Sequence, residues 1–189
     1  MYTTSATLLE RVRLRTDHAA WDRFVQLYTP FLYHCGRKSG LEESDAADAV
    51  QDVFLVLLEK LPTFQYSQDG SFRAWLRTVT VRKCFERFRK RHEVAVGGSE
   101  AELIDQLQAD DSEALWDIDY REHLVARALE IMQAEFEPTT WQACWQTIVE
   151  DRPAAEVAAE LGITRNAVFV ARCRVLRRLR DEFGDLVED

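Results

Sequence analysis

The sequence predicts an all-α protein built from two small helical domains. Apolar residues recur three and four positions apart through most of the chain, which is the spacing of amphipathic helices rather than the alternation of strands. Proline and glycine fall at the borders of these periodic segments, where helices start and stop. Residues 94–120 contain eight Asp and Glu but no Lys or Arg, and they include Gly97-Gly98-Ser99. We therefore expect domains at 1–93 and 121–189, joined by an acidic flexible linker.

Composition excludes several classes of protein. The chain has 189 residues and a net charge of -9, yet residues 1–93 carry 15 Lys and Arg against 12 Asp and Glu. No run approaches the roughly 20 apolar residues of a membrane span, and the N-terminus does not resemble a secretory signal, so we expect a cytoplasmic protein without membrane insertion. The four cysteines lie far apart, which predicts free thiols and no metal site. No catalytic constellation or cofactor motif is visible, so the sequence does not predict an enzyme.

The first domain begins with a predicted short helix that carries Leu8 and Val12. A second helix is expected after Asp17, whose side chain can cap it. Pro30 is expected to start a third helix that ends near Gly40, because proline is favoured at the first helical position and glycine just past the last.

Residues 45–60, DAADAVQDVFLVLLEK, are the most helix-like segment of this domain. One face is apolar and includes Ala46, Val50, Val53, Leu57 and Leu58. Four candidate partner-binding residues project elsewhere: Asp48, Gln51, Asp52 and Phe54. A solvated acidic face and a docking surface for a basic partner both fit this pattern.

A loop at 63–71 leads into a predicted helix at 72–91 in which basic and aromatic residues alternate. Such interleaving suits single-stranded DNA, because aromatic rings stack on unpaired bases and basic groups follow phosphates. The candidate DNA-binding residues are Phe64, Tyr66, Phe72, Trp75, Arg77, Arg82, Lys83 and Arg87. A solvated basic helix that packs through its aromatic residues would look similar, and Phe64 and Tyr66 also fit as caps on the core.

The next predicted helix can be capped by Ser112 and runs through Leu124 and Met132 until Pro138 interrupts it. The next helix carries Trp141 and Trp145 four positions apart, which we interpret as core rather than as a ligand site.

Residues 153–180 have the pattern of a helix-turn-helix. Val157 and Leu161 mark the apolar face of a first helix, Gly162 suits a left-handed C-terminus, and Thr164 can cap a second helix. In such motifs the second helix lies in the major groove, where Arg and Asn match base edges. The candidates for this contact are Arg165, Asn166, Phe169, Arg172, Arg174 and Arg177. The alternative is an ordinary helical hairpin with a solvated basic face.

In their order and spacing these segments resemble the extracytoplasmic-function group of bacterial sigma factors, the small members of the sigma-70 family that carry only regions two and four. The resemblance implies that Asp48, Gln51, Asp52 and Phe54 bind the β′ coiled coil of core RNA polymerase, and that 63–91 opens the promoter minus-ten element. It also implies that 153–180 reads the minus-thirty-five element. The implied partners are the β′ and β subunits, promoter DNA and an anti-sigma factor.

Two other functions fit the same sequence. A stand-alone helix-turn-helix transcriptional regulator would bind duplex DNA without polymerase. A helical polymerase-binding adaptor would occupy polymerase without reading DNA. The acidic linker fits two roles, as a mimic of nucleic acid along the RNA path or as a spacer between two DNA-binding domains.

Overall fold

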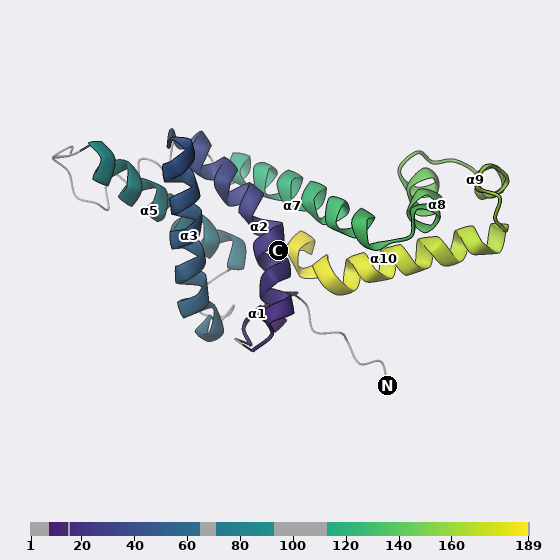
Figure 1. The fold of residues 1–189 in the computed structure, drawn as a ribbon, viewed down its shortest axis with the longest axis horizontal. Helices are drawn as coiled ribbons and strands as arrows, with labels where there is room; N and C mark the ends of the chain where they lie inside the picture. The colour runs from purple at the N-terminus through teal and green to yellow at the C-terminus, as the bar shows by residue number, and fades with distance from the viewer. Residues whose placement is uncertain (1–7, 15, 65–70, 93–112, 189) are drawn as a thin grey trace. The chain divides into compact units, whose positions relative to one another are not determined.

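The computed structural model of the chain describes residues 8–14, 16–64, 71–92 and 113–188. Every regular element in these ranges is a helix, so the all-α prediction is confirmed for this part of the chain. The described residues form two compact units, 8–124 and 125–188 (Figure 1). None of the helices within the described ranges is both long and apolar enough to cross a membrane.

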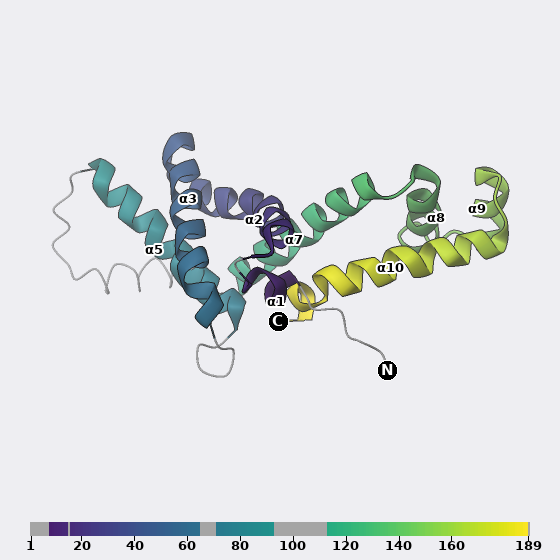
Figure 2. The same ribbon diagram turned by 60° about the horizontal axis from the view of Figure 1, so that its bottom comes forward.

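The first unit is a bundle in which three long helices pack against one another (Figure 2). Its elements are α1 (Leu8–Val12), α2 (His18–Lys38), α3 (Glu43–Lys60), the 3-10 turn η1 (Leu61–Thr63) and α5 (Phe72–His92). Asp17 caps α2 as predicted, since its Oδ1 accepts a 2.9 Å hydrogen bond from the Ala20 amide. At the other end, Gly40 takes a φ of 85°, the left-handed conformation expected after the helix.

The expectation that Pro30 starts a separate helix was wrong. Helix α2 runs without a break from His18 to Lys38, and Pro30 lies inside it. An interior proline removes one backbone hydrogen bond and costs about 3 kcal/mol. The aromatic rings of Tyr28 and Phe31 on either side are fully buried. Burying large side chains contributes about 1.5–3 kcal/mol each, enough to keep the helix continuous.

Helix α7 (Glu113–Glu135) begins inside the segment expected to be a linker. Trp116, Tyr120 and Leu124 follow one another at intervals of four residues, and all three are buried. The Tyr120 hydroxyl lies 2.9 Å from the hydroxyl of Tyr28, and the Trp116 ring meets Phe31 edge to face at 5.0 Å. This half of α7 is therefore part of the first unit. Residues 94–112, the rest of the predicted linker, lie outside the described residues.

The second unit contains the remainder of α7 and three further helices, α8 (Pro138–Ile148), α9 (Ala154–Leu161) and α10 (Arg165–Glu188). Helix α10 packs on both α8 and α9. Small side chains occupy the contact between them, and the buried cluster consists of Ala143, Val157, Ala158, Val168 and Ala171. Because these side chains are short, the three helices approach one another closely and fix the position of α10.

Candidate nucleic-acid and partner interface

Helix α3 carries the predicted partner-binding residues. Asp48 and Asp52 lie one helical turn apart, with side chains 49% and 27% exposed. Gln51 is exposed between them, while Phe54 is half-buried with its ring centre 6.3 Å from that of Phe24. The helix therefore presents two carboxylates and an amide to solvent, groups that accept hydrogen bonds from basic side chains.

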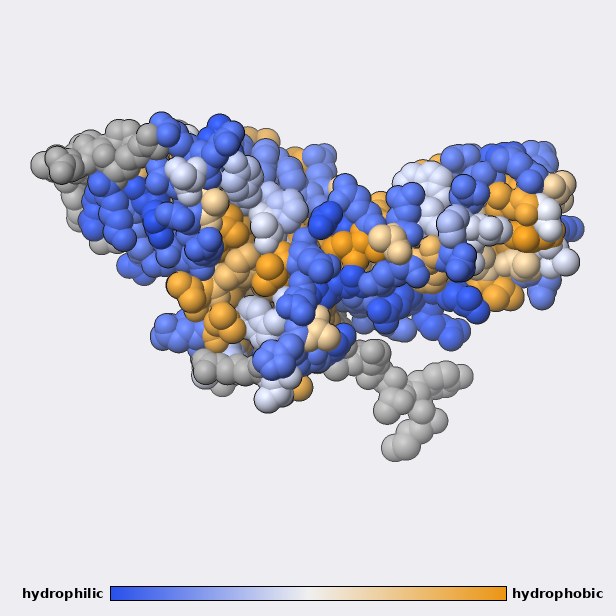
Figure 3. Space-filling model, viewed as in Figure 1, coloured by the Kyte–Doolittle hydropathy of each residue, from blue (hydrophilic) through white to orange (hydrophobic). Residues whose placement is uncertain are grey.

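An apolar strip accompanies these polar groups on α3. Leu55 is 63% exposed, and Leu58, expected in the buried face, is 41% exposed. Figure 3 shows the hydrophobic colour over the lower part of this helix, next to hydrophilic surface. Sequence reasoning missed Leu55, although its position three residues after Asp52 and four after Gln51 places it on the same side of the helix. A polar surface with an apolar neighbour is typical of protein interfaces.

Arg87 of α5 joins the two carboxylates of α3. Its Nε and Nη2 lie 2.7 Å and 2.6 Å from Asp52 Oδ2, and its Nη1 lies 2.8 Å from Asp48 Oδ2. The hydrogen bond to Asp52, followed by the charges of the aspartates, raises the pKa of the Arg87 guanidinium. The structure thus brings together one residue predicted to bind DNA and two predicted to bind a protein.

The other predicted cations of α5 are differently placed. Arg82 is exposed, with its Nε 4.0 Å from Glu86, whereas Lys83 Nζ forms a 2.7 Å ion pair with the same carboxylate. Arg77 is half-buried. Arg73 pairs with Asp117 of α7 at 3.0 Å, and the sequence analysis had not anticipated this contact. The basic residues of α5 therefore divide between solvent and intramolecular pairs.

The predicted stacking residues form an aromatic cluster at the start of α5. Phe64 and Phe72 are only 4% and 1% exposed, and Trp75 is half-buried with its ring centre 4.9 Å from that of Phe64. Phe64 thus caps the core in this structure. Tyr66 lies outside the described residues. Among the described members of the set, Trp75 is the aromatic side chain that reaches solvent.

The turn between α9 and α10 has the geometry that its sequence predicts. Gly162 adopts φ 65° and ψ 30°, and the following Ile163 amide bonds to the Ala158 carbonyl at 3.0 Å. Thr164 Oγ1 accepts a 3.1 Å hydrogen bond from the Ala167 amide, which satisfies a backbone donor at the start of α10. Ile163 packs against the buried cluster. The predicted cap at Thr164 is confirmed.

Helix α10 turns most of its candidate DNA-binding residues to solvent. The exposed members are Arg165, Asn166, Phe169, Arg174 and Arg177. Arg172 is half-buried beside the cluster residue Ala171. Val170 and Cys173 are also exposed on this helix and were not predicted as site residues.

An ion-pair network supports the loop before α9. Arg152 donates to Glu160 Oε2 at 2.6 Å and to Gln146 Oε1 at 3.0 Å, and Gln146 Nε2 donates to Glu160 Oε1 at 3.3 Å. The hydrogen bond from Arg152 lowers the pKa of Glu160, and the same contact raises the pKa of Arg152. The network links α8, the loop and α9, so it orients the first helix of the motif.

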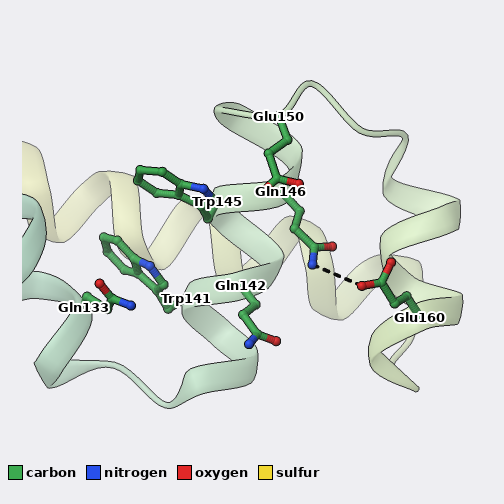
Figure 4. Close-up of a pocket in the computed structure, with 7 residues that line it drawn as sticks. All are labelled: Gln133, Trp141, Gln142, Trp145, Gln146, Glu150 and Glu160. Carbon is green, nitrogen blue, oxygen red and sulfur yellow. Dashed lines mark hydrogen bonds between the residues drawn. The ribbon is translucent and has the colours of Figure 1, made fainter.

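A hollow of about 440 Å³ lies on the outside of α8 (Figure 4). The rings of Trp141 and Trp145 stack there with centres 5.9 Å apart. Glutamine and glutamate side chains line the remainder of the hollow, namely Gln133, Gln142, Gln146, Glu150 and Glu160. Trp141 is buried as predicted, but Trp145 is only half-buried and forms part of the wall.

Metal-binding and reactive thiol groups are not gathered at these surfaces. In the part of the chain that the structure describes, no three His, Cys, Asp or Glu side chains lie close enough to hold a metal ion. All four cysteines are free. Burial raises the pKa of the Cys84 thiol to about 11, so this cysteine remains protonated.

A comparison with protein families finds a match within the first unit. The family model for sigma-70 region 2 matches residues 24–93, from the first third of α2 to just past the end of α5. This match supports a sigma-70 family sigma factor. Such proteins are non-catalytic factors that act in transcription initiation, and the family implies binding to core RNA polymerase and promoter DNA. No curated protein sequence matches the chain.

Proposed function

We propose that this protein is a sigma factor of the extracytoplasmic-function group, which binds core RNA polymerase and directs promoter-specific transcription initiation. The observation that carries the proposal is the sigma-70 region 2 match at 24–93, followed in the same chain by a capped helix-turn-helix. Region 2 alone fits several kinds of sigma factor. Only residues 93–112 lie between α5 and α7, which leaves no room for a further domain between region 2 and the helix-turn-helix and favours the group in which region four follows region two directly.

The α3 surface is the proposed docking site for the β′ coiled coil. Asp48, Gln51 and Asp52 supply acceptors, and the neighbouring Leu55 supplies apolar contact area. An amphipathic partner helix with Arg or Lys beside an apolar stripe has the complementary chemistry. The half-buried ring of Phe54 packs against Phe24 of α2 and so helps to hold α3 in place.

Helix α5 is the proposed site for the opened minus-ten element. Trp75 reaches solvent at one end, and Arg77, Arg82 and Lys83 follow along the helix. An aromatic residue followed by cations is the arrangement that binds unpaired bases and their phosphates. Promoter melting requires polymerase in this proposal, because region 2 then acts on DNA already held by the complex.

Helix α10 is the proposed reader of the minus-thirty-five duplex. Asn166, Arg174 and Arg177 are exposed and offer donors for base edges or phosphates. Gly162 and Thr164 fix the start of this helix, so the side chains of its first turns are presented in a defined orientation. An anti-sigma factor that covers the α3 or α10 surface would restrain such a protein.

Reconstituted transcription tests the proposal. Purified protein is added to core RNA polymerase with a library of promoter fragments, and the start sites are sequenced. Specific initiation that depends on the protein supports the proposal. Binding of duplex promoter DNA without polymerase, with no specific initiation, would instead support a stand-alone regulator. Polymerase binding with no promoter preference would support an adaptor.

Two variants divide the proposed surfaces. Asp52→Ala should weaken core binding, while Arg174→Ala should leave core binding unchanged and reduce initiation at promoters that need the upstream element. A base contact by arginine is worth about 1–3 kcal/mol, so the loss at such promoters is about 5- to 150-fold. Equal effects of both variants on core binding would contradict the assignment of two separate surfaces.

A further inference from the structure

We propose that Arg87 is a positioning residue for the acidic surface of α3, defined as Asp48 and Asp52, and that it does not contact promoter DNA. The inference rests on the proposed function, because it assigns Arg87 to the polymerase-binding surface instead of the minus-ten site. Three observations carry it: the face of α5 on which Arg87 lies, the geometry of its guanidinium, and the charge of the group that it joins.

The position of Arg87 along α5 places it on the buried side of the helix. Leu76, Thr80 and Cys84 follow one another at intervals of four residues and are all buried. Arg87 comes three residues after Cys84, which continues the same stripe. Its side chain is 23% exposed, whereas that of Arg82 is 59% exposed. In the sequence Arg82 and Arg87 belong to the same basic cluster, but in the helix their side chains lie on different faces.

The guanidinium of Arg87 is engaged by α3 through all three of its nitrogens. Nε and Nη2 share Asp52 Oδ2, and Nη1 bonds to Asp48 Oδ2, at distances of 2.6 to 2.8 Å. These are the short distances of charge-assisted hydrogen bonds. To contact a phosphate, Arg87 would have to break its ion pairs with Asp48 and Asp52. Arg82 already lies on the exposed side of the helix.

The acidic surface needs this cation for its own geometry. Asp48 and Asp52 are one turn apart on the same helix, so their negative charges repel each other. The Arg87 guanidinium lies between them and offsets the repulsion. Its contacts use Oδ2 of each aspartate, and the side chains of Asp48 and Asp52 are still 49% and 27% exposed, so the donors of a partner can reach both carboxylates. Arg87 therefore holds two carboxylates in one arrangement before the partner arrives.

Removing Arg87 has two opposing effects on binding of a basic partner. It removes a nearby positive charge, which favours the partner, but solvent screens that gain at this half-exposed site. It also frees two side chains that the partner must then order, and ordering costs about two- to tenfold in affinity for each side chain. We expect the second effect to be larger, with a net loss of about fivefold in affinity for core polymerase.

The test compares Arg87→Ala with the matched control Arg82→Ala in the full-length protein. Affinity for core RNA polymerase is measured by titration, and binding of a single-stranded minus-ten oligonucleotide to the assembled holoenzyme is measured at several salt concentrations. Arg87→Ala should weaken core binding about fivefold and leave the salt dependence of oligonucleotide binding unchanged. Arg82→Ala should leave core binding unchanged and reduce the slope of log affinity against log salt by about 0.7, the value for one phosphate contact on a single strand.

Two further measurements separate positioning from general stability. In the Arg87→Ala background, Asp52→Asn should reduce core affinity by less than it does in the wild type, because the positioned carboxylate is already lost. Arg87→Lys should restore only part of the affinity, since an ammonium group cannot bridge two carboxylates as a planar fork does. If Arg87→Ala is poorly folded, the comparison of Arg87→Lys with wild type in both assays gives the same decision.

Two results would overturn the inference. One is core affinity that is unchanged or higher in Arg87→Ala, and the other is a reduced salt slope for Arg87→Ala that matches Arg82→Ala. Failure of the proposed function has a different signature, because the wild-type protein would then either not bind core polymerase or bind it without directing specific initiation.

Discussion

Replacing Trp116 with alanine should release residues 113–124 of α7 from the first unit. The indole is only 3% exposed, packs edge to face on Phe31 and stacks on Tyr120 at 5.3 Å. A tryptophan of this kind buries roughly 150–250 Å², equivalent to about 4–6 kcal/mol at 25 cal/mol per Å². Measured Trp→Ala substitutions in cores cost about 3–5 kcal/mol, so we expect a loss in that range.

Ile118 provides the matched control on the same helix. Its side chain is 51% exposed, two residues from Trp116. Ile118→Ala should change stability by about 0.5 kcal/mol or less, as surface substitutions do. The difference between the two variants then measures burial against α2 and not the helix propensity of α7.

Hydrogen exchange measured by mass spectrometry resolves the two units separately. A single unfolding temperature would not, because two compact units need not unfold together. In Trp116→Ala, protection of α7 and the facing part of α2 should fall by about a hundredfold or more, while α8 to α10 remain as in the wild type. Equal protection in Trp116→Ala and Ile118→Ala would refute the argument that this half of α7 completes the core of the first unit.

Three other predictions concern caps and charge. Gly162→Ala should destabilise the second unit by about 1 kcal/mol, because the new Cβ meets no atom within 4 Å and the cost is that of a positive φ alone. Chemical denaturation measures this loss of stability, and Gly162→Asn should cost less. Thr164→Ala should cost about 1 kcal/mol by removing the cap on the Ala167 amide, seen as faster exchange of that amide. The hydrogen bond from Lys38 lowers the pKa of Asp119 from 3.8, so the ion pair stabilises the fold above about pH 4 and this stabilisation is lost as pH falls through the lowered pKa. The difference in stability between wild type and Lys38→Met should therefore shrink between about pH 5 and pH 3. A difference that stays constant over this range would contradict the pairing.

Local signals in the sequence were sufficient for most helix boundaries. The side chain of Asp17, the φ of Gly162 and the hydroxyl of Thr164 each act within four residues of their own position. Such effects can be predicted from type and spacing alone. Pro30 shows the limit of this reasoning, since whether a proline starts or interrupts a helix depends on what its neighbours bury elsewhere.

The packing of the first half of α7 in the first unit was hidden by its composition. The acidic residues around Trp116 and Tyr120 indicated a linker, although the aromatic residues already had helical spacing. Only the opposite surface, with Tyr28 and Phe31, shows that this spacing has a partner. Pairing between segments some ninety positions apart leaves no mark in either segment alone.

The candidate site shows the same division. Residue type predicted which side chains carry charge, and helical periodicity predicted most exposed positions on α10. It did not predict that Arg87 faces α3, because the choice between two sides of α5 depends on how that helix packs. Leu55 was overlooked for a related reason, as an exposed leucine is recognised only when the buried stripe is known.

The three alanines at the helix crossing, Ala143, Ala158 and Ala171, set the distance between α8, α9 and α10. A larger side chain at one of these positions would push a helix outward, because the alanine side chains that it meets have no other rotamer that could make room. Among relatives of this protein, these positions should accept glycine, alanine or serine and reject leucine, even where the exposed residues of α10 vary freely. A library that randomises the exposed residues of α10, the proposed DNA-binding surface, can therefore leave these three positions fixed without restricting the variation at that surface.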